Sequence, residues 1–363
     1  MIGIIRISKT RMKALKRGRL GEKQMELKEF EVVKKVEQLT YPQDWTSYNY
    51  AKTKEKTIAQ QLLVELADIY AEEHKRVHFG RPSFTLQEKL IAMFIYSFSR
   101  FSTRKAIADI ELAKKVGLIS KTPHFNSISN MFKDDYLMSV LCDLVEITSL
   151  PLRMFEEHLS IDSSGFSCSA FERWLNVRTQ KTEKKRHWKK ANIICGARTQ
   201  IIAGITISDG FAADSPELVP LVKKASKNFD MKEVSADKAY LSRDNLLAVS
   251  KLGAIPYIPF KKNSRQNPRG YKIWQAMYNY FHTNQEEFMK HYHKRSNVET
   301  TFSMLKRNFG SKLRMKNWTG QINELLMKCL CHNLTVLVQE SFELGLEINL
   351  KACAKIHVAQ KEN

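Results

Sequence analysis

EHLSIDSSGFSCSA, residues 157–170, alternates apolar and polar side chains, and this period of two predicts a β-strand. Its acid, Asp162, is expected at the end of that strand. Two more β-favouring runs follow, ANIICGA at 191–197 and TQIIAGITISDG at 199–210, each bounded by turn residues. The stretch therefore begins a meander of three consecutive strands.

Helices and strands alternate after this meander. SPELVPLVKKASKNF (215–229) predicts a helix and MKEVSAD (231–237) a strand. SRDNLLAVSKLG (242–253) predicts a second helix and AIPYIPF (254–260) a buried strand. The order βββ-α-β-α-β, followed by helices, predicts an α/β fold. Its mixed sheet carries helices on both faces, the architecture of a ribonuclease H-like domain.

The net charge indicates the class of partner. The 59 Lys and Arg residues exceed the 38 Asp and Glu residues by 59 − 38 = 21, an excess that attracts polyanions such as nucleic acid. The sequence shows no lipidation motif, no secretory h-region and no apolar run of about 18 residues that could span a membrane. We therefore expect a cytoplasmic protein that has a nucleic-acid partner and no membrane partner.

The composition changes along the chain and suggests four regions. Residues 1–80 form a basic N-terminal arm that is partly helical, and residues 84–150 form an α-helical, DNA-binding module. Residues 154–340 contain the predicted sheet and form the α/β domain, and residues 341–363 are a C-terminal tail. The N-terminal helical module therefore precedes the α/β domain.

The six cysteines form no CxxC pair, and we expect them to be reduced and buried. CLCHN at 329–333 could suggest a zinc site. It lies, however, within ELLMKCLCHNLTVLV (324–338), whose apolar pattern favours a core helix.

Three carboxylates occupy positions that can meet through the fold. Asp162 and Asp237 each follow a strand, and if these strands are neighbours their side chains converge at one edge of the sheet. Glu299 lies on the helix after the last strand. Three carboxylates can hold two Mg²⁺ ions, which promote displacement at phosphorus. The alternative for each aspartate is an ordinary turn former.

A polar stripe surrounds Glu299. Tyr292, Arg295, Glu299 and Lys306 stand at offsets 0, 3, 7 and 14, so on one continuous helix they share a stripe about 60° wide. The alternative is a surface pair of Arg295 with Glu299, which stabilises a helix by only a few tenths of a kcal/mol. Such a pair leaves the other two residues unexplained.

The segment RTQKTEKKRHWKKAN (178–192) between the first two strands is strongly basic. Lys185, Arg186 and Lys189 are candidates to neutralise DNA phosphates, although a charged run can also be merely a solvated loop. Trp274, in a helical pattern further on, is interpreted as a core aromatic in preference to a base-stacking residue.

The stripe resembles the YREK signature of insertion-sequence transposases of the DDE class. IDSSGFS (161–167) is similar to the first acidic motif of that family and ADKAYLSRDN (236–245) to the second, with Ala239 where Gly is common. The resemblance covers residues 84–340. It does not extend to the N-terminal arm or the tail.

The resemblance implies a ribonuclease H-like DDE catalytic domain and a mechanism. Asp162, Asp237 and Glu299 would be both catalytic residues and ligands of two Mg²⁺ ions, with Mn²⁺ as a substitute. Cleavage at the transposon ends would be followed by transfer of the 3′-hydroxyl into target DNA. The other three residues of the stripe would bind phosphates of the transposon end, and a homodimer would pair two ends in the synaptic complex.

Two other functions remain open from the sequence. A ribonuclease H-like nuclease or resolvase would cleave DNA without strand transfer. A captured, inactive transposase would only bind DNA. The long N-terminal region speaks against the first of these, and the presence of all three acids speaks against the second.

Overall fold

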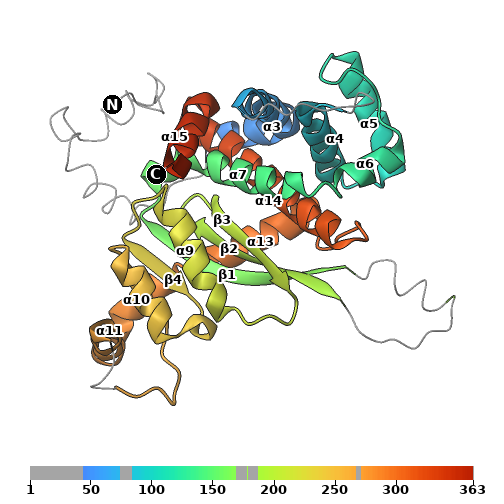
Figure 1. Ribbon diagram of the computed structural model, residues 1–363. Coiled ribbons are helices and arrows are strands. Elements are labelled where there is room, and N and C mark those ends of the chain that lie inside the picture. Colours follow the sequence, from blue (N-terminus) through green and yellow to red (C-terminus); the bar gives the residue numbers. More distant parts are fainter. Residues whose placement is uncertain (1–43, 74–83, 169–177, 179–186, 267–270, 363) are drawn as a thin grey trace, which may run out of the picture.

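The computed structural model describes residues 44–73, 84–168, 178, 187–266 and 271–362. Its centre is a five-stranded sheet (Figure 1) in the order β3-β2-β1-β4-β5. The strands are β1 His158–Ser167, β2 Trp188–Gly196, β3 Ile202–Asp209, β4 Glu233–Ala236 and β5 Ile255–Tyr257. The first three pair antiparallel, whereas β4 and β5 run parallel to β1. This topology confirms the predicted α/β class and the ribonuclease H-like mixed sheet.

Helices precede, connect and follow the strands. Before the sheet come α3 Trp45–Glu73, α4 Leu86–Ser99, α5 Thr103–Lys115, α6 Phe125–Met131, α7 Tyr136–Ser149 and the 3₁₀ turn η2 Leu150–Phe155. Between its strands lie η3 Ser215–Glu217, α9 Leu218–Ser226, η4 Lys238–Tyr240 and α10 Arg243–Lys251. After it come α11 Lys272–Thr283, α12 Gln285–His293, α13 Ser296–Phe309, α14 Trp318–Glu343 and α15 Leu350–Glu362. None of the helices in the described ranges is sufficiently long and apolar to cross a bilayer.

The sheet separates two hydrophobic clusters. Ile194 packs with the cluster formed by α9, α10, α11 and α12, whereas its neighbour Ile193 packs with the cluster formed by the N-terminal helices, α13, α14 and α15. Successive side chains of a strand point to opposite faces, so each face of β2 is covered by one helical layer. Figure 1 shows these two layers on either side of the strands.

Helix α14 is the centre of the second layer. It lies against α3 and α7, and α7 in turn lies against β3. Asn333 joins three of these elements: its Nδ2 donates to Val145 O at 3.1 Å and to Ile202 O at 2.9 Å, and its Oδ1 accepts from Ile202 N at 2.9 Å. The N-terminal helices and the sheet therefore share one core, and the four-region division stays a prediction.

The CLCHN segment is part of this core. Cys329, Cys331 and His332 are buried within α14, as the core-helix interpretation predicted, and the cysteines of the chain are free thiols. Burial raises the pKa of the Cys329 thiol to about 12. These thiols are consequently protonated, unreactive core groups at neutral pH.

The helical part of the N-terminal arm is α3. Leu63 and Leu66 are fully buried, so this helix is a structural element of the core. Residues 1–43 and 74–80 of the predicted arm lie outside the described part of the chain. Thr85 and Glu88 form a capping box at the start of the next helix, α4.

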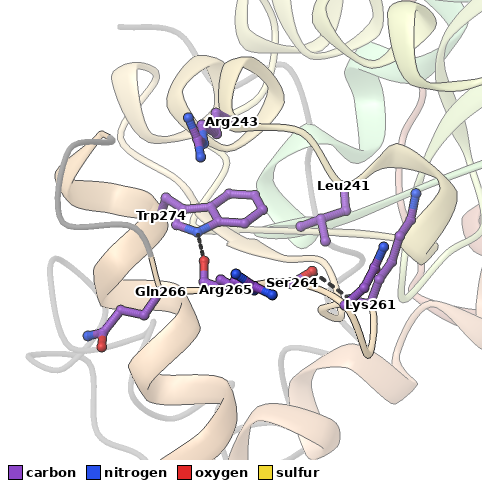
Figure 2. A pocket seen from close by; sticks show the side chains of 8 residues that line it. Leu241, Arg243, Lys261, Ser264, Arg265, Gln266 and Trp274 are labelled. Carbon is purple, nitrogen blue, oxygen red and sulfur yellow. Dashed lines mark hydrogen bonds between the residues drawn. The ribbon is translucent and has the colours of Figure 1, made fainter.

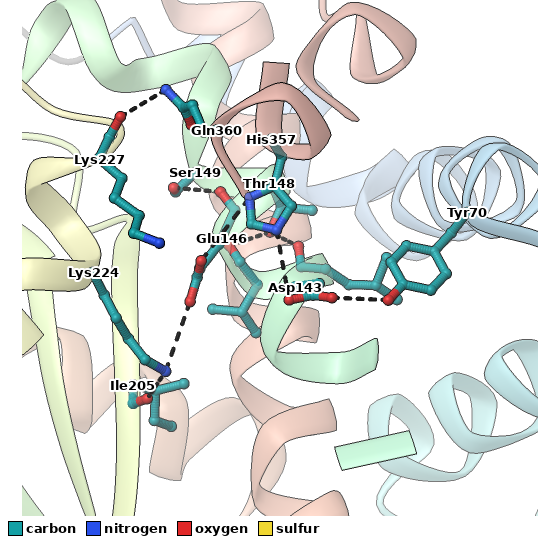
Figure 3. A network of polar contacts seen from close by, with 12 residues as sticks. Tyr70, Asp143, Glu146, Thr148, Ser149, Ile205, Lys224, Lys227, His357 and Gln360 are labelled. Carbon is teal, nitrogen blue, oxygen red and sulfur yellow. Dashed lines mark hydrogen bonds and ion pairs between the residues drawn. The ribbon is translucent and has the colours of Figure 1, made fainter. Parts of the chain in front are cut away.

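The predicted C-terminal tail contains a docked helix, α15. His357 of this helix places Nε2 at 3.5 Å from Asp143 Oδ1 and Nδ1 at 4.0 Å from Glu146 Oε2 (Figure 3). Asp143 also accepts a hydrogen bond from Tyr70 OH at 2.8 Å, and Lys224 Nζ lies 3.7 Å from Glu146 Oε1. This polar network joins α3, α7, α9 and α15 at one place.

Tyr70→Phe removes the hydroxyl that donates to the buried carboxylate of Asp143. We expect the free energy of unfolding to fall by about 1.5–3 kcal/mol, because a hydrogen bond to a charged group is lost and the carboxylate stays buried. Urea denaturation measures the change. The matched control is Tyr50→Phe, which removes an exposed hydroxyl from the same helix. Equal effects of the two substitutions would show that the network contributes nothing.

Candidate active site

Two of the predicted acids follow neighbouring strand positions at one edge of the sheet. β1 pairs with β4 up to Ile161 and Ala236, so the next residue of each chain segment is an acid, Asp162 or Asp237. The prediction that Asp162 ends its strand was wrong. β1 continues five residues further, to Ser167, because it goes on pairing with β2. Asp162 marks the end of the pairing with β4 instead.

The side chain of Asp162 projects toward the layer that contains α13. Ile161 belongs to the cluster on the opposite face, and alternation along β1 therefore turns Asp162 and Phe166 to the α13 face. Lys306 of α13 lies over this strand, with its Nζ 5.2 Å from the centre of the Phe166 ring. The helix that carries the third predicted acid thus crosses the face from which Asp162 projects.

The predicted continuous helix through the polar stripe was wrong. α12 ends at His293 and α13 begins at Ser296. Between them Arg295 N donates to Tyr292 O at 2.9 Å and Val298 N donates to Arg295 O at 3.0 Å, a spacing typical of a 3₁₀ turn. Arg295 keeps right-handed helical dihedrals (φ −57°, ψ −29°), so the sequence period continues through the turn although the helix is divided.

Arg295 joins two of the predicted acids. Its Nη1 donates to Asp162 Oδ2 at 2.7 Å and its Nη2 donates to Glu299 Oε1 at 2.5 Å. The side chain of Arg295 is 16% exposed, whereas that of Glu299 is 59% exposed. Such charge-assisted bonds are stronger than neutral ones. A cation of the protein itself therefore lies between the acids of β1 and α13.

The three carboxylates are close enough to influence one another. Burial raises the pKa of Asp162 above its ordinary value, and the charges of Asp237 and Glu299 raise it further. The Ser163 N–H, 2.8 Å from Asp162 Oδ1, and the Arg295 charge act in the opposite direction but do not cancel the rise. Positive charge brought to this place consequently stabilises the ionised form of Asp162.

The donor set fits a hard divalent cation, because all three side chains offer carboxylate oxygens. Across the described residues, however, no three His, Cys, Asp or Glu side chains are grouped closely enough to hold a metal ion. The Arg295 guanidinium bonds to Asp162 and Glu299 in this arrangement. A cation bound by all three acids therefore requires that this guanidinium give up its present bonds.

Tyr292 and Lys306, the other two residues of the stripe, flank the acids. The Arg295 guanidinium carbon lies 5.7 Å from the centre of the Tyr292 ring. Burial raises the pKa of the Tyr292 hydroxyl and lowers the pKa of the Lys306 ammonium. Lys306 Nζ donates to Ser164 Oγ at 2.6 Å, two residues along β1 from the first acid. The stripe is therefore brought together, although it spans two helices.

The basic loop is described only in part. Lys185 and Arg186 lie outside the described residues. Lys189 belongs to β2, where its Nζ donates to Asp209 Oδ1 at 2.8 Å and lies 3.4 Å from the centre of the Trp318 ring. Its side chain is 12% exposed. This lysine is therefore held by an acid and an aromatic ring in the structure.

A fourth acid lies next to the site and was not predicted. Asp214, in the connection between β3 and α9, accepts from Ser163 Oγ at 2.9 Å and from Lys190 Nζ at 2.9 Å. Lys190 also donates to Ala212 O at 2.7 Å. The sequence offered Lys190 only as one charge in a basic run, without a signal for its partner. These bonds tie the β3–α9 connection to the residue directly after Asp162.

A second hydrogen-bonded cluster lies at the opposite end of β4 and holds α12. Glu233 Oε2 is 2.7 Å from His158 Nδ1 and 2.8 Å from His291 Nδ1. Lys294 Nζ approaches the same oxygen at 3.7 Å. Burial lowers the pKa of His158, so the neutral ring donates to Glu233 and accepts from Ser235 Oγ at 2.7 Å. Burial raises the pKa of Glu233, but the hydrogen bonds with His158 and His291 outweigh this effect and lower the pKa to about 2.

Glu233→Gln is expected to destabilise the protein in a pH-dependent manner. The pKa of Glu233 falls from 4.5 to about 2 on folding, so its stabilisation is complete above 4.5 and is lost as the pH falls toward about 2. After allowance for solvent screening, we expect a loss of about 1–2 kcal/mol at pH 7 that shrinks across this window. Urea denaturation at several pH values measures it. Glu286→Gln, which changes an exposed side chain on α12, is the control. If the loss of unfolding free energy in Glu233→Gln did not vary with pH, the lowered pKa of Glu233 would be contradicted.

Arg295 and Asp162 are expected to be energetically coupled in metal-free protein. A double-mutant cycle of Arg295→Gln and Asp162→Asn should give a coupling energy of about 1–3 kcal/mol, because the pair is largely buried. The same cycle on Lys189 and Asp209, whose carboxylate side chain is 67% exposed, should give less than about 1 kcal/mol. Urea denaturation in a chelating buffer measures both. Equal coupling energies would refute the bridging role of Arg295.

Two comparisons with known proteins found similarities to this chain. The family model of the transposase DDE domain matches residues 153–334, which is half of the chain and includes the sheet and all three acids. A cryo-EM structure of a piggyBac transposase synaptic complex with hairpin DNA is similar at a TM-score of 0.39 and 11% sequence identity, covering 85% of this chain and 80% of that one. The chain belongs to the family of transposases with a DDE catalytic domain.

Proposed function

We propose that this enzyme is the transposase of an insertion sequence, which cleaves DNA at the element's ends and transfers the 3′-hydroxyl into target DNA. Asp162, Asp237 and Glu299 are its catalytic residues. The observation that carries the proposal is that Arg295 bonds to both Asp162 and Glu299, while Asp237, directly after β4, is near enough for its charge to raise the pKa of Asp162. Carboxylates held close together repel one another, and a bound cation relieves this repulsion.

The same three acids are the proposed ligands of two Mg²⁺ ions, for which Mn²⁺ can substitute. When bound, the ions supply Lewis-acid stabilisation of the phosphate and activate the attacking oxygen. The buried Asp162 contributes a carboxylate whose charged form is costly unless a cation is near. The exposed Glu299 is free to adjust its position because it lies on the surface of α13.

DNA phosphates are the proposed partners of the cations that border the acids. The planar guanidinium of Arg295 can bind a phosphate through two hydrogen bonds, and the ammonium of Lys306 can act as a point charge. Tyr292 can donate a hydrogen bond through its hydroxyl and stack through its ring. Lys189 would first exchange its bond to Asp209 for a phosphate. Lys185 and Arg186 are proposed as DNA contacts from the sequence alone.

The partner is double-stranded DNA, both the element's terminal inverted repeats and the target. The formal charge of +21 supports the attraction of the whole chain to such a polyanion. We assign recognition of the repeats to the helices of residues 84–150 and propose a homodimer, because two ends must be joined to one target. Action on chromosomal DNA places the protein in the cytoplasm, at the nucleoid.

Asp162→Asn, Asp237→Asn and Glu299→Gln are each expected to reduce strand cleavage at least about 100-fold, because each removes a charged oxygen ligand. The assay uses full-length protein, Mg²⁺ and a duplex that ends in the element's terminal repeats, with DNA binding measured in parallel. Binding should be retained. Asp230→Asn, which changes an exposed acid far from the site, should leave cleavage unchanged.

The products of the same assay separate the possible functions. Joined products with target DNA support strand transfer, whereas nicked ends without joining identify a nuclease. Binding of the repeats by the parent protein without cleavage in Mg²⁺ or Mn²⁺ would identify a DNA-binding protein. Cleavage by the Asp162→Asn variant at the parent's rate contradicts the assignment of the catalytic acids.

A further inference from the structure

A basic cavity lies outside the three-acid site. Its volume is about 610 Å³, and its walls come from the start of α10, the segment after β5 and α11. Figure 2 shows Arg243, Lys261 and Arg265 around it, with Trp274 at its base. Three cations thus border one concave surface.

The lining of this cavity contains no acid. Over the described part of the chain, none of Arg243, Lys261 and Arg265 forms an ion pair, and all three are exposed. The nearest acid along the chain, Asp244, accepts a hydrogen bond from Tyr271 OH at 3.3 Å. Cations brought together without acids repel one another, so the arrangement favours a bound anion.

The cavity is preformed by backbone and ring contacts. Trp274 is 8% exposed, and its Nε1 donates to Arg265 O at 3.1 Å. The guanidinium carbon of Arg243 lies 5.6 Å from the centre of the same ring, a cation–π contact. Ser264 N donates to Lys261 O at 2.9 Å and its Oγ accepts from Lys261 N at 3.1 Å, closing a turn. Trp274 is therefore a core residue, as predicted, that also supports the two arginines.

The cavity opens on the same edge of the sheet as the acids. β4 and β5 are parallel neighbours, so the segments that leave their carboxyl ends emerge together. Asp237 directly follows β4, and Leu241 of the cavity wall stands four residues later. Lys261 follows β5 after three residues. A strand of DNA held at the acids can therefore continue along this edge into the cavity.

We propose that this cavity binds backbone phosphates of the DNA strand that extends from the three acids, through Arg243, Lys261 and Arg265. The proposal rests on the proposed function, because it takes DNA as the substrate. Phosphate is the anion that fits, since a DNA strand carries one charge for about every 3.4 Å of helix axis and thus offers several charges to a cluster of cations. The contacts read no base edges, so the binding is independent of sequence.

The salt dependence of DNA binding tests the proposal. The full-length double variant Arg243→Ala/Lys261→Ala is titrated with duplex and single-stranded DNA of arbitrary sequence at several salt concentrations. The slope of log K against log salt should become shallower by about 1.8 for duplex and about 1.4 for single strands, since two phosphate contacts are lost. The matched control, Lys223→Ala/Lys251→Ala, removes two exposed lysines from α9 and α10 away from the cavity and should keep the parent's slope.

Two results would overturn the proposal. One is a slope in the cavity variant that equals the parent's. The other is a combination of two measurements: inorganic phosphate raises the melting temperature of the parent but not of the cavity variant, and the variant keeps the parent's salt slope for DNA. This combination would show that the cavity is a site for free phosphate. Cleavage by Asp162→Asn separates the two hypotheses: if that variant cleaves normally, the proposed function fails, and the salt slopes still decide whether the cavity binds DNA.

Discussion

The parallel pairing of β1 with β4 is the constraint on which the site depends. It ends at Ile161 and Ala236, and the two acids are the next residues. A shift of this register by one residue would turn one of the carboxylates to the other face of the sheet, where the α9–α12 cluster lies. The antiparallel pairing of β1 with β2 continues beyond Asp162 to Ser167, so this part of the strand stays in the sheet next to α13.

Acidic and basic side chains lie close together at this edge of the sheet, although the protein as a whole is basic. Arg295 lies between two acids, Lys190 contacts Asp214, and Lys306 contacts a serine of β1. The acids are thus surrounded by cations that already have partners at short distance. Departure of Arg295 or Lys190 leaves a carboxylate uncompensated in a half-buried place, which is costly unless another cation takes its place.

Much of the fold could be predicted because the spacing of apolar and polar residues within each segment indicates whether that segment is a strand or a helix. The alternation in β1 and the alternating helices and strands indicated the order of the elements along the chain, and Asp237 lies directly after its strand as expected. The division of α12 from α13 could not be predicted, because Arg295 keeps helical dihedrals and leaves the sequence period intact. The docking of α15 was missed because it depends on a buried polar network from three distant elements.

The residues of the candidate site could be named from the sequence, whereas their contacts in the structure could not be predicted. Three acids and a polar stripe could be named from spacing and resemblance, since these are properties of the sequence. The bond from Arg295 to Asp162 spans 133 residues and depends on where α13 crosses the sheet. Asp214 belongs to no motif and is held next to the site by Ser163 of β1 and by Lys190, which β2 places opposite Gly165.

The packing of α3 on α14 and α15 also sets the order in which the molecule can be completed during synthesis. α3 is the first described helix to leave the ribosome, whereas its partners leave last. A nascent chain that already contains β1 and β4 still lacks the helix that closes the second layer, and its long-range contacts form late. The second layer is therefore completed only after α14 and α15 have been translated, so a product truncated before α14 would carry both aspartates without this layer.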